Sequence, residues 1–334
     1  MDPLTQGALG AALPAATGSS RQTRVAAAVG FVAGMAADLD VLIRSQTDSL
    51  LFLEYHRQFT HSFAFIPVGG FLAAALFFLC FRRWLSIGFR RLWLFSSLGY
   101  ATHGLLDAAT SYGTQLFWPF SDHRISFSIV SVVDPLFTLP VLGLVVAAVL
   151  RKRPGWARLA LVWAACYLAV GAYRHQAAAV LAEDLARRRG HVAVRLDVKP
   201  TFANLIVWRS IYEADGRFYV DGVRPGFAEA IVEGASIAKL DVARVFPWLD
   251  PSSQQAKDID RFSRFSDGFV AAPEGGDERI IDVRYAFLPN KIAPLWSIRL
   301  DRTAPPTAHV RFETHRGDAD RNLRALLAMA FDRR

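Results

Sequence analysis

A histidine and an aspartate four residues apart mark the most reactive-looking stretch of this chain. Residues 100–135 read YATHGLLDAATSYGTQLFWPFSDHRISFSIVSVVDP, and the pair is His103 and Asp107. On a helix this spacing puts both side chains on one face, one turn apart. An imidazole and a carboxylate presented together are suitable ligands for a divalent metal. A helix-capping Asp beside an unrelated His has the same spacing, so the pair alone leaves both interpretations open.

Other ionisable residues lie at the ends of the neighbouring apolar segments. Asp38 and Asp40 end one apolar run, and His56, Arg57 and His61 come just before the next. Ionisable side chains at such places are costly in a membrane and usually have functional partners. We therefore predict that these residues converge with His103 and Asp107 on one site.

The elements that must position this site are apolar helices. The chain has 334 residues, 52% of them hydrophobic, and its long apolar runs fall almost entirely within residues 1–182. The rest alternates and is rich in charge. The prediction is a mainly α fold, with a polytopic transmembrane helical domain over residues 1–182 and a soluble α+β domain over residues 183–334.

The apolar runs predict individual membrane spans. Residues 4–16 are too short for a comfortable crossing of a core of about 30 Å. Residues 44–60 are polar, and Leu50–Leu53 within them are expected at the lipid interface. The predicted spans cover residues 25–43, 63–81, 92–109, 129–150 and 159–181.

The basic residues predict the orientation. The formal net charge of +8 comes largely from three turns between apolar runs, which hold Arg21 and Arg24, then Arg82 to Arg91, then Arg151 to Arg158. Such charge is typical of topology signals, so no nucleic-acid partner is expected. Alternating spans place all three turns in the cytoplasm of a bacterium. The candidate site and the soluble domain then lie on the outer side of the inner membrane.

The soluble domain has its own strand and helix signals. Residues 205–212 and 217–223 flank Ala214-Asp215-Gly216, which predicts a β-hairpin. Residues 227–246 have helical spacing. Residues 279–288, 294–300 and 309–313 alternate as strands, and residues 318–331 predict a closing helix.

Several ordered motifs resemble one known family. MDPLTQGALGAAL opens the chain, followed by DLD at 38–40, HRQFTHS at 56–62, HGLLD at 103–107, SYGTQLFWPFSDHR at 111–124 and DPLF at 134–137. Together they resemble the YdjM-like family, whose members are described as membrane-bound metal-dependent hydrolases. The match covers roughly residues 1–140, and WRSIYEADGRFYVD at 208–221 is similar to the downstream domain of longer members. The family usually has His where this chain has Gln6.

The residues suggest specific roles. We expect the metal ligands to be His56, His61, His103 and Asp107, with Asp38 and Asp40 as further ligands or as a bridge between two ions. A mixed shell of imidazoles and carboxylates suits Zn, Mn or Fe, and metal-bound water would be the nucleophile.

Four residues are expected to assist that chemistry, each with a structural alternative. Asp40 or Asp134 would act as the base, and Arg57 and Arg124 would hold a phosphate or a developing oxyanion. Asp40 and Asp134 could instead end or cap helices, and Arg57 could extend to lipid head groups.

The sequence thus favours metal-dependent hydrolysis of an ester or phosphoester, with an amphiphilic or lipid substrate. The alternative is a non-catalytic membrane protein that binds an ion or a lipid and uses the soluble domain to hold a protein partner, which the sequence does not identify. Transport is less favoured, because the polar residues collect at one end of the spans rather than at the midplane.

Overall fold

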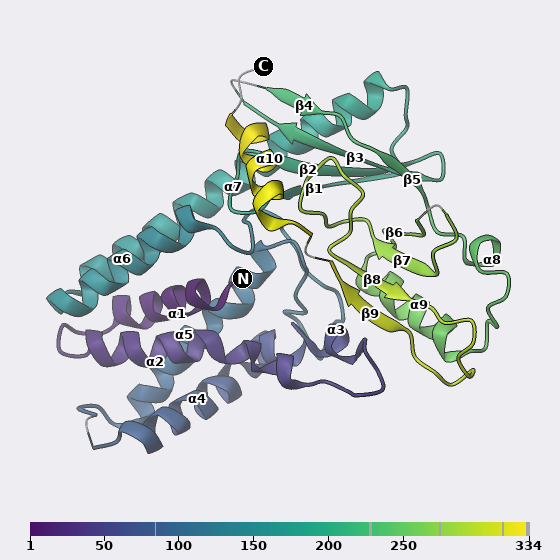
Figure 1. Ribbon diagram of the computed structural model, residues 1–334. Helices are drawn as coiled ribbons and strands as arrows, with labels where there is room; N and C mark the ends of the chain where they lie inside the picture. Colours follow the sequence, from purple (N-terminus) through teal and green to yellow (C-terminus); the bar gives the residue numbers. More distant parts are fainter. Residues whose placement is uncertain (84, 227–228, 274, 316, 332–334) are drawn as a thin grey trace. The chain divides into compact units, whose positions relative to one another are not determined.

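Two compact units divide the chain. The computed structural model describes residues 1–83, 85–226, 229–273, 275–315 and 317–331 (Figure 1). We call residues 1–42, 55–173 and 202–204 the helical unit. Residues 43–54, 174–201 and 205–334 form the sheet unit. The division falls inside one long helix, and one internal segment of the first half of the chain belongs to the sheet unit.

The helical unit is built from apolar helices and short 3-10 turns. Two of its helices begin at a side-chain cap: Asp2 accepts from the Thr5 amide at the start of α1, and Asp134 accepts from the Phe137 amide at the start of α6. A proline follows each cap at the first helical position. The elements are α1 (Pro3–Thr17), α2 (Thr23–Ala36), η1 (Ala37–Leu42), η2 (Phe59–His61), η3 (Phe63–Phe65), α4 (Ile66–Phe81), α5 (Phe89–Ala109), α6 (Pro135–Arg151) and the start of α7 (Pro154–Arg188).

Glycines let α1, α2 and α5 touch backbone to backbone. A Cβ on Gly30 would lie 2.3 Å from the carbonyl oxygen of Gly10, and one on Gly99 would lie 2.6 Å from that of Gly30. No larger residue fits such an approach. The close packing holds the end of α2 and the second half of α5 at a fixed separation.

Among the described residues, three helical stretches are long and apolar enough to cross a membrane: Thr23–Leu42, Phe63–Phe81 and Pro154–Arg188. The predicted span over 129–150 is too long, because its helix begins only at Pro135 and α6 has 17 residues. Residues 129–134 have no helical structure. The proline at the first helical position sets that start.

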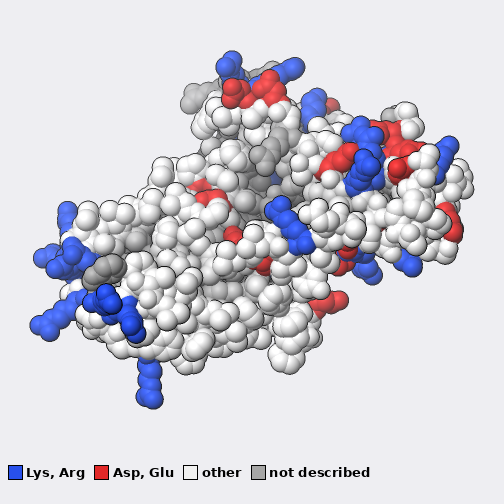
Figure 2. Space-filling view, turned by 60° about the horizontal axis from the view of Figure 1, so that its bottom comes forward, with Lys and Arg blue, Asp and Glu red and all other residues white. Residues whose placement is uncertain are grey.

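The three basic turns lie together at one end of the helical unit. The Arg24 side chain donates to the Val149 carbonyl, and the Arg158 side chain donates to the Ala16 carbonyl. Figure 2 shows a group of Lys and Arg side chains at that end, beside a surface that is largely free of charge in this view. The α2 and α5 helices start at this end, so η1 and the end of α5 lie at the other.

The sheet unit contains two antiparallel sheets. The first has the order β1-β2-β3-β4, with β5 also paired to β3, and comprises β1 (Arg195–Pro200), β2 (Trp208–Ala214), β3 (Arg217–Arg224), β4 (Ala230–Val232) and β5 (Ser236–Ala238). The second has the order β6-β7-β8-β9, comprising β6 (Val270–Ala271), β7 (Arg279–Asp282), β8 (Trp296–Arg299) and β9 (Arg311–Thr314). One core of buried residues, including Phe218, Val220 and Ile281, joins the two sheets.

The predicted hairpin is confirmed, and the predicted helix over 227–246 is wrong. Asp215 and Gly216 have positive φ, as a tight hairpin turn between β2 and β3 requires. Instead of a helix, β4 and β5 each pair with β3, so strand pairing overrides helical spacing there. Residues 227 and 228 lie outside the described residues. The short helix α8 (Val242–Val245) and the helices α9 (Gln254–Phe265) and α10 (Ala319–Phe331) complete the unit.

The expectation that Leu50–Leu53 lie at the lipid interface is also wrong. Leu50 and Leu53 are buried in a core of the sheet unit with Phe262 of α9 and Ile298 of β8. The segment contains the short helix α3 (Leu51–Tyr55). Its apolar face is covered by protein, and an amphipathic pattern alone does not distinguish that environment from lipid.

Candidate metal centre

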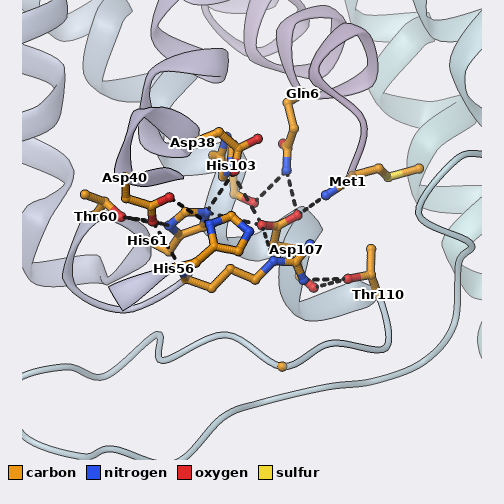
Figure 3. Close-up of polar contacts among 12 residues, drawn as sticks. Met1, Gln6, Asp38, Asp40, His56, Thr60, His61, His103, Asp107 and Thr110 are labelled. Carbon is orange, nitrogen blue, oxygen red and sulfur yellow. Dashed lines mark hydrogen bonds and ion pairs between the residues drawn. The ribbon is translucent and has the colours of Figure 1, made fainter. Parts of the chain in front are cut away.

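Three segments of the helical unit bring four predicted residues together. Figure 3 shows Asp38 of η1, His61 of η2, and His103 and Asp107 of α5 pointing toward one another. Three of these side chains are fully buried, whereas Asp38 retains 24% exposure. The close packing of α2 against α5 and the short turn of η2 place them there.

The donor atoms lie at similar separations. Nε2 of His61 is 3.5 Å from Oδ1 of Asp38 and 3.3 Å from Oδ2 of Asp107. Nε2 of His103 is 3.3 Å and 3.6 Å from the same two oxygens. Two imidazole nitrogens and two carboxylate oxygens therefore surround one point.

Hydrogen bonds behind the rings fix which nitrogen faces that point. Nδ1 of His103 is 2.6 Å from the Gly34 carbonyl oxygen, which can only accept, so Nδ1 carries the proton. Nδ1 of His61 is 2.9 Å from the Thr60 hydroxyl and 3.3 Å from Asp40. Both rings thus present Nε2 to the centre, as metal-binding histidines do.

Several atoms at the centre lack hydrogen bonds within the described part of the chain. These buried atoms are Nε2 of His61, Nε2 of His103, Oδ2 of Asp107 and Oε1 of Gln6. Buried polar atoms in proteins are nearly always paired, so such a group calls for a ligand. Oxygen and imidazole nitrogen donors suit a divalent transition metal, and the residues present fit one.

Asp40 and His56 form a second group that shares Asp38. Oδ1 of Asp40 accepts from Nδ1 of His56 at 2.7 Å, and its Oδ2 accepts from the Thr60 hydroxyl at 2.7 Å and from the Arg57 amide at 3.1 Å. Both oxygens of Asp40 therefore already have donors. Its contacts orient His56 and His61.

Arg57 lies inside the site rather than extending to head groups. Its side chain is buried, with Nε 3.1 Å from Oδ2 of Asp107 and a terminal nitrogen donating to the Thr110 hydroxyl at 3.0 Å. Its φ of 63° is unusual for a residue with a side chain and marks a constrained turn. The other oxygen of Asp107 accepts from Nε2 of Gln6 at 2.9 Å and pairs with the Met1 amino group.

Two predicted residues have other partners. Asp134 caps α6 and accepts from the Tyr167 hydroxyl at 2.8 and 2.9 Å. Arg124 donates to the backbone carbonyls of His56 and Gly113. These contacts are the expected helix cap for Asp134 and a loop-bracing role for Arg124. His123 is exposed.

Sequence reasoning missed the residues that allow the approach. A Cβ on Gly104 would lie 2.3 Å from the His61 carbonyl oxygen, so this glycine lets η2 rest on α5. Thr60 and Gly34 supply the contacts behind the two rings. The glycine inside HGLLD, and the threonine that precedes His61, were visible signals, but their partners depend on the fold.

Residues 1–178 match the YdjM inner membrane protein family. The chain belongs to this family. The resemblance of its motifs to this family is therefore confirmed, and the chain is a membrane protein. No solved structure matches the chain.

Two curated relatives are similar to parts of this YdjM family member. The inner membrane protein YbcI of Escherichia coli is 35% identical over 97 residues, which cover 28% of this chain and 54% of YbcI. The uncharacterized protein YfhP of Bacillus subtilis is 27% identical over 146 residues, or 43% of each chain. The chain thus spans about half the length of the curated relatives it matches.

Proposed function

We propose that this protein is a membrane-bound, metal-dependent hydrolase of an ester or phosphoester with an amphiphilic or lipid substrate. Asp38, His61, His103 and Asp107 would hold the ion. The donor set suits Zn, Mn or Fe. A bound ion would supply a water molecule of lowered pKa as the nucleophile.

The spacing of the four donor atoms is the observation that carries this proposal. At bond lengths of about 2.0–2.1 Å, two ligands of a tetrahedral ion lie about 3.3–3.4 Å apart. The four nitrogen-to-oxygen separations run from 3.3 to 3.6 Å. Four side chains from three segments have this spacing with no hydrogen bond between their facing atoms.

Asp38 marks the side from which water and substrate would approach, because it is the only one of the four with an exposed side chain. On that side His56 is half-exposed, with Nδ1 held by Asp40. Its other nitrogen is then free to accept a proton, so Asp40 would act through His56 as part of the base. Buried Arg57 supplies a positive charge next to Asp107, suited to a developing oxyanion or a phosphate.

The depth of the site supports an amphiphilic substrate. The segments that point ligands inward point large apolar side chains outward: Leu39 is 63% exposed, Phe63 39% and Leu105 53%. Leu39 lies between Asp38 and Asp40, and Leu105 lies between His103 and Asp107. Apolar side chains that favour lipid over water therefore lie next to the ligands in the sequence.

Metal analysis of the purified full chain tests the metal site. We expect one or two equivalents of Zn or Mn in the wild type, and a loss of at least one equivalent in His103→Ala and Asp107→Asn. His123→Ala, an exposed loop histidine, is the matched control. Full metal content in both site variants would rule out the proposed ligands.

An activity panel then separates the hydrolase from a non-catalytic ion-binding protein. Short-chain phospholipids and carboxylic esters are presented in detergent micelles with and without added metal. Turnover that is lost in His103→Ala supports the enzyme. Tight metal binding without turnover, with unfolding on chelation, would indicate a closed structural site instead.

The orientation is part of the proposal. The basic turns at one end of the helical unit favour the cytoplasm, which would put the metal centre and the sheet unit on the outer side of the inner membrane. A C-terminal reporter that is active only in the periplasm should work. Activity of a cytoplasm-only reporter at that position would reverse the orientation.

A further inference from the structure

The segment 43–54 connects two parts of the candidate metal centre but belongs to the other unit. It leaves the helical unit after Leu42, at the end of η1, which contains Asp38 and Asp40. It returns at Tyr55, the last residue of α3, directly before His56. Both ends of the segment are thus covalently joined to residues of the site.

One arginine holds this segment within the sheet unit. Arg261 of α9 donates to both oxygens of Asp48, at 3.1 and 2.8 Å, and to Glu54 at 2.6 Å. It also donates to buried Asp258 at 2.8 Å. A forked, bidentate contact of this kind fixes geometry as well as charge. Arg261 therefore fixes the segment near its middle and at its end.

Apolar and backbone contacts complete the anchorage. Ser49 donates to the Val310 carbonyl at 2.7 Å and accepts from the Phe312 amide at 3.1 Å. Phe52 packs edge-on against Phe312 with ring centroids 5.2 Å apart. The segment is thus an integral part of the sheet unit rather than a loose connection.

We propose that the sheet unit sets the metal affinity of the site by holding segment 43–54, with Arg261 as the positioning residue. The inference rests on the proposed function, since it concerns the same site. Holding the segment restricts the backbone of η1 and of the turn at His56. Less conformational entropy is then lost when an ion binds, which strengthens binding. Whatever loosens or tightens the sheet unit around Arg261 would then weaken or strengthen metal binding.

Zinc competition titrations of the full chain in micelles test the link. Arg261→Met keeps an unbranched apolar stem and removes the guanidinium donors. We expect about tenfold weaker zinc binding, the lower limit of the loss on removing a hydrogen-bond partner of a metal ligand, because Arg261 acts one step further away. Arg264→Met is the matched control, because Arg264 is exposed on the same helix. Asp48→Asn should weaken zinc binding by a smaller factor. If Arg261→Met does not fold, this variant tests whether the sheet unit affects zinc affinity.

Hydrogen exchange of the metal-free protein provides a second measurement. The amides of Arg57, His61 and Ser62 are hydrogen-bonded within the helical unit. They should exchange faster in Arg261→Met and Asp48→Asn than in Arg264→Met. If the wild type binds no zinc, the proposed function fails. The exchange rates alone then test whether the sheet unit restrains the segments that contain the site residues. Equal exchange and equal affinity in all variants would overturn it.

Discussion

Two buried clusters of His and Asp, one in each unit, differ in how completely their atoms are paired. In the sheet unit, Asp258 has four donors: Gln254 and Arg261 on one oxygen, His309 and the Val310 amide on the other. In the helical unit, Asp107 also has cationic neighbours, yet its Oδ2 lacks a hydrogen bond. The facing nitrogens of His61 and His103 lack one too.

This difference in hydrogen-bond pairing distinguishes a structural cluster from a candidate binding site. Ionisable side chains are buried in both, so burial alone says little about function. A cluster whose donors and acceptors all match is complete as folded. A cluster that leaves converging acceptor atoms unpaired needs a cation, and this distinction places the candidate site in the helical unit.

Breaking each cluster should therefore have opposite consequences. Asp258→Ala leaves Arg261 and His309 without their buried acceptor, so we expect the sheet unit to lose about 3–5 kcal/mol of stability. Metal stoichiometry at saturating zinc should stay close to that of the wild type, because all the proposed ligands remain. His103→Ala should remove metal while the metal-free protein loses much less stability. Thermal unfolding and metal analysis of both variants measure the two effects, and metal loss in both to the same extent would remove the distinction.

Gly104→Ala should weaken metal binding without removing a ligand. The new Cβ would lie 2.3 Å from the His61 carbonyl, so η2 must move away from α5 and carry His61 with it. We expect at least a tenfold loss of zinc affinity, since misplacing a ligand by about 1 Å is severe. Gly143→Ala is the control in α6, where a Cβ meets no atom within 4 Å. It should be neutral or slightly stabilising, and equal zinc affinity in the two variants would contradict the packing argument.

Much of the candidate site could be predicted because membrane physics restricts where ionisable residues occur. Asp38, His61, His103 and Asp107 all follow from charges at the ends of apolar runs, and the structure brings them together. The helix cap at Asp134 was likewise one of two open interpretations. The structure shows that cap, because the Asp134 carboxylate accepts from the Phe137 amide and from the Tyr167 hydroxyl.

The features that the sequence did not predict depend on contacts between distant segments. Leu50–Leu53 have an amphipathic pattern that fits a lipid surface and a protein core equally well. Only the sheet unit, far along the chain, decides between them. The sequence did not predict the strands β4 and β5 for the same reason, because their pairing with β3 outweighs the local helical preference. Caps, turns and charges at the ends of apolar runs were predictable, whereas side-chain environments and strand pairings set by distant segments were not.

Gln6 offers a finer test of what the unpaired atoms mean. Its amide nitrogen donates to Asp107, while its oxygen lacks a hydrogen-bond partner. Gln6→His would put an imidazole, a stronger ligand than an amide oxygen, in that place. We expect tighter zinc binding or an additional ion, and Gln6→Leu should cost less affinity than His103→Ala. Titration of Zn and Mn against the three variants measures this. Unchanged binding in Gln6→His with a misfolded Gln6→Leu would make Gln6 a packing residue.

The smallest expected effect is the acid sensitivity of the fully paired cluster. Burial alone would raise the pKa of Asp48. Hydrogen bonds from Arg261 and the Leu50 amide outweigh burial and lower that pKa below its usual value. A carboxyl whose pKa is lower in the folded state stabilises the fold above its unfolded pKa, near 4, and loses that contribution as pH falls through the folded value. Unfolding of the sheet unit should therefore become easier below about pH 4. Asp48→Asn should flatten this dependence, whereas Asp320→Asn, at an exposed position of α10, should not. Urea titrations between pH 3 and pH 6 measure both slopes, and a slope in Asp48→Asn as steep as in the wild type would mean that the Arg261 contact adds no stability.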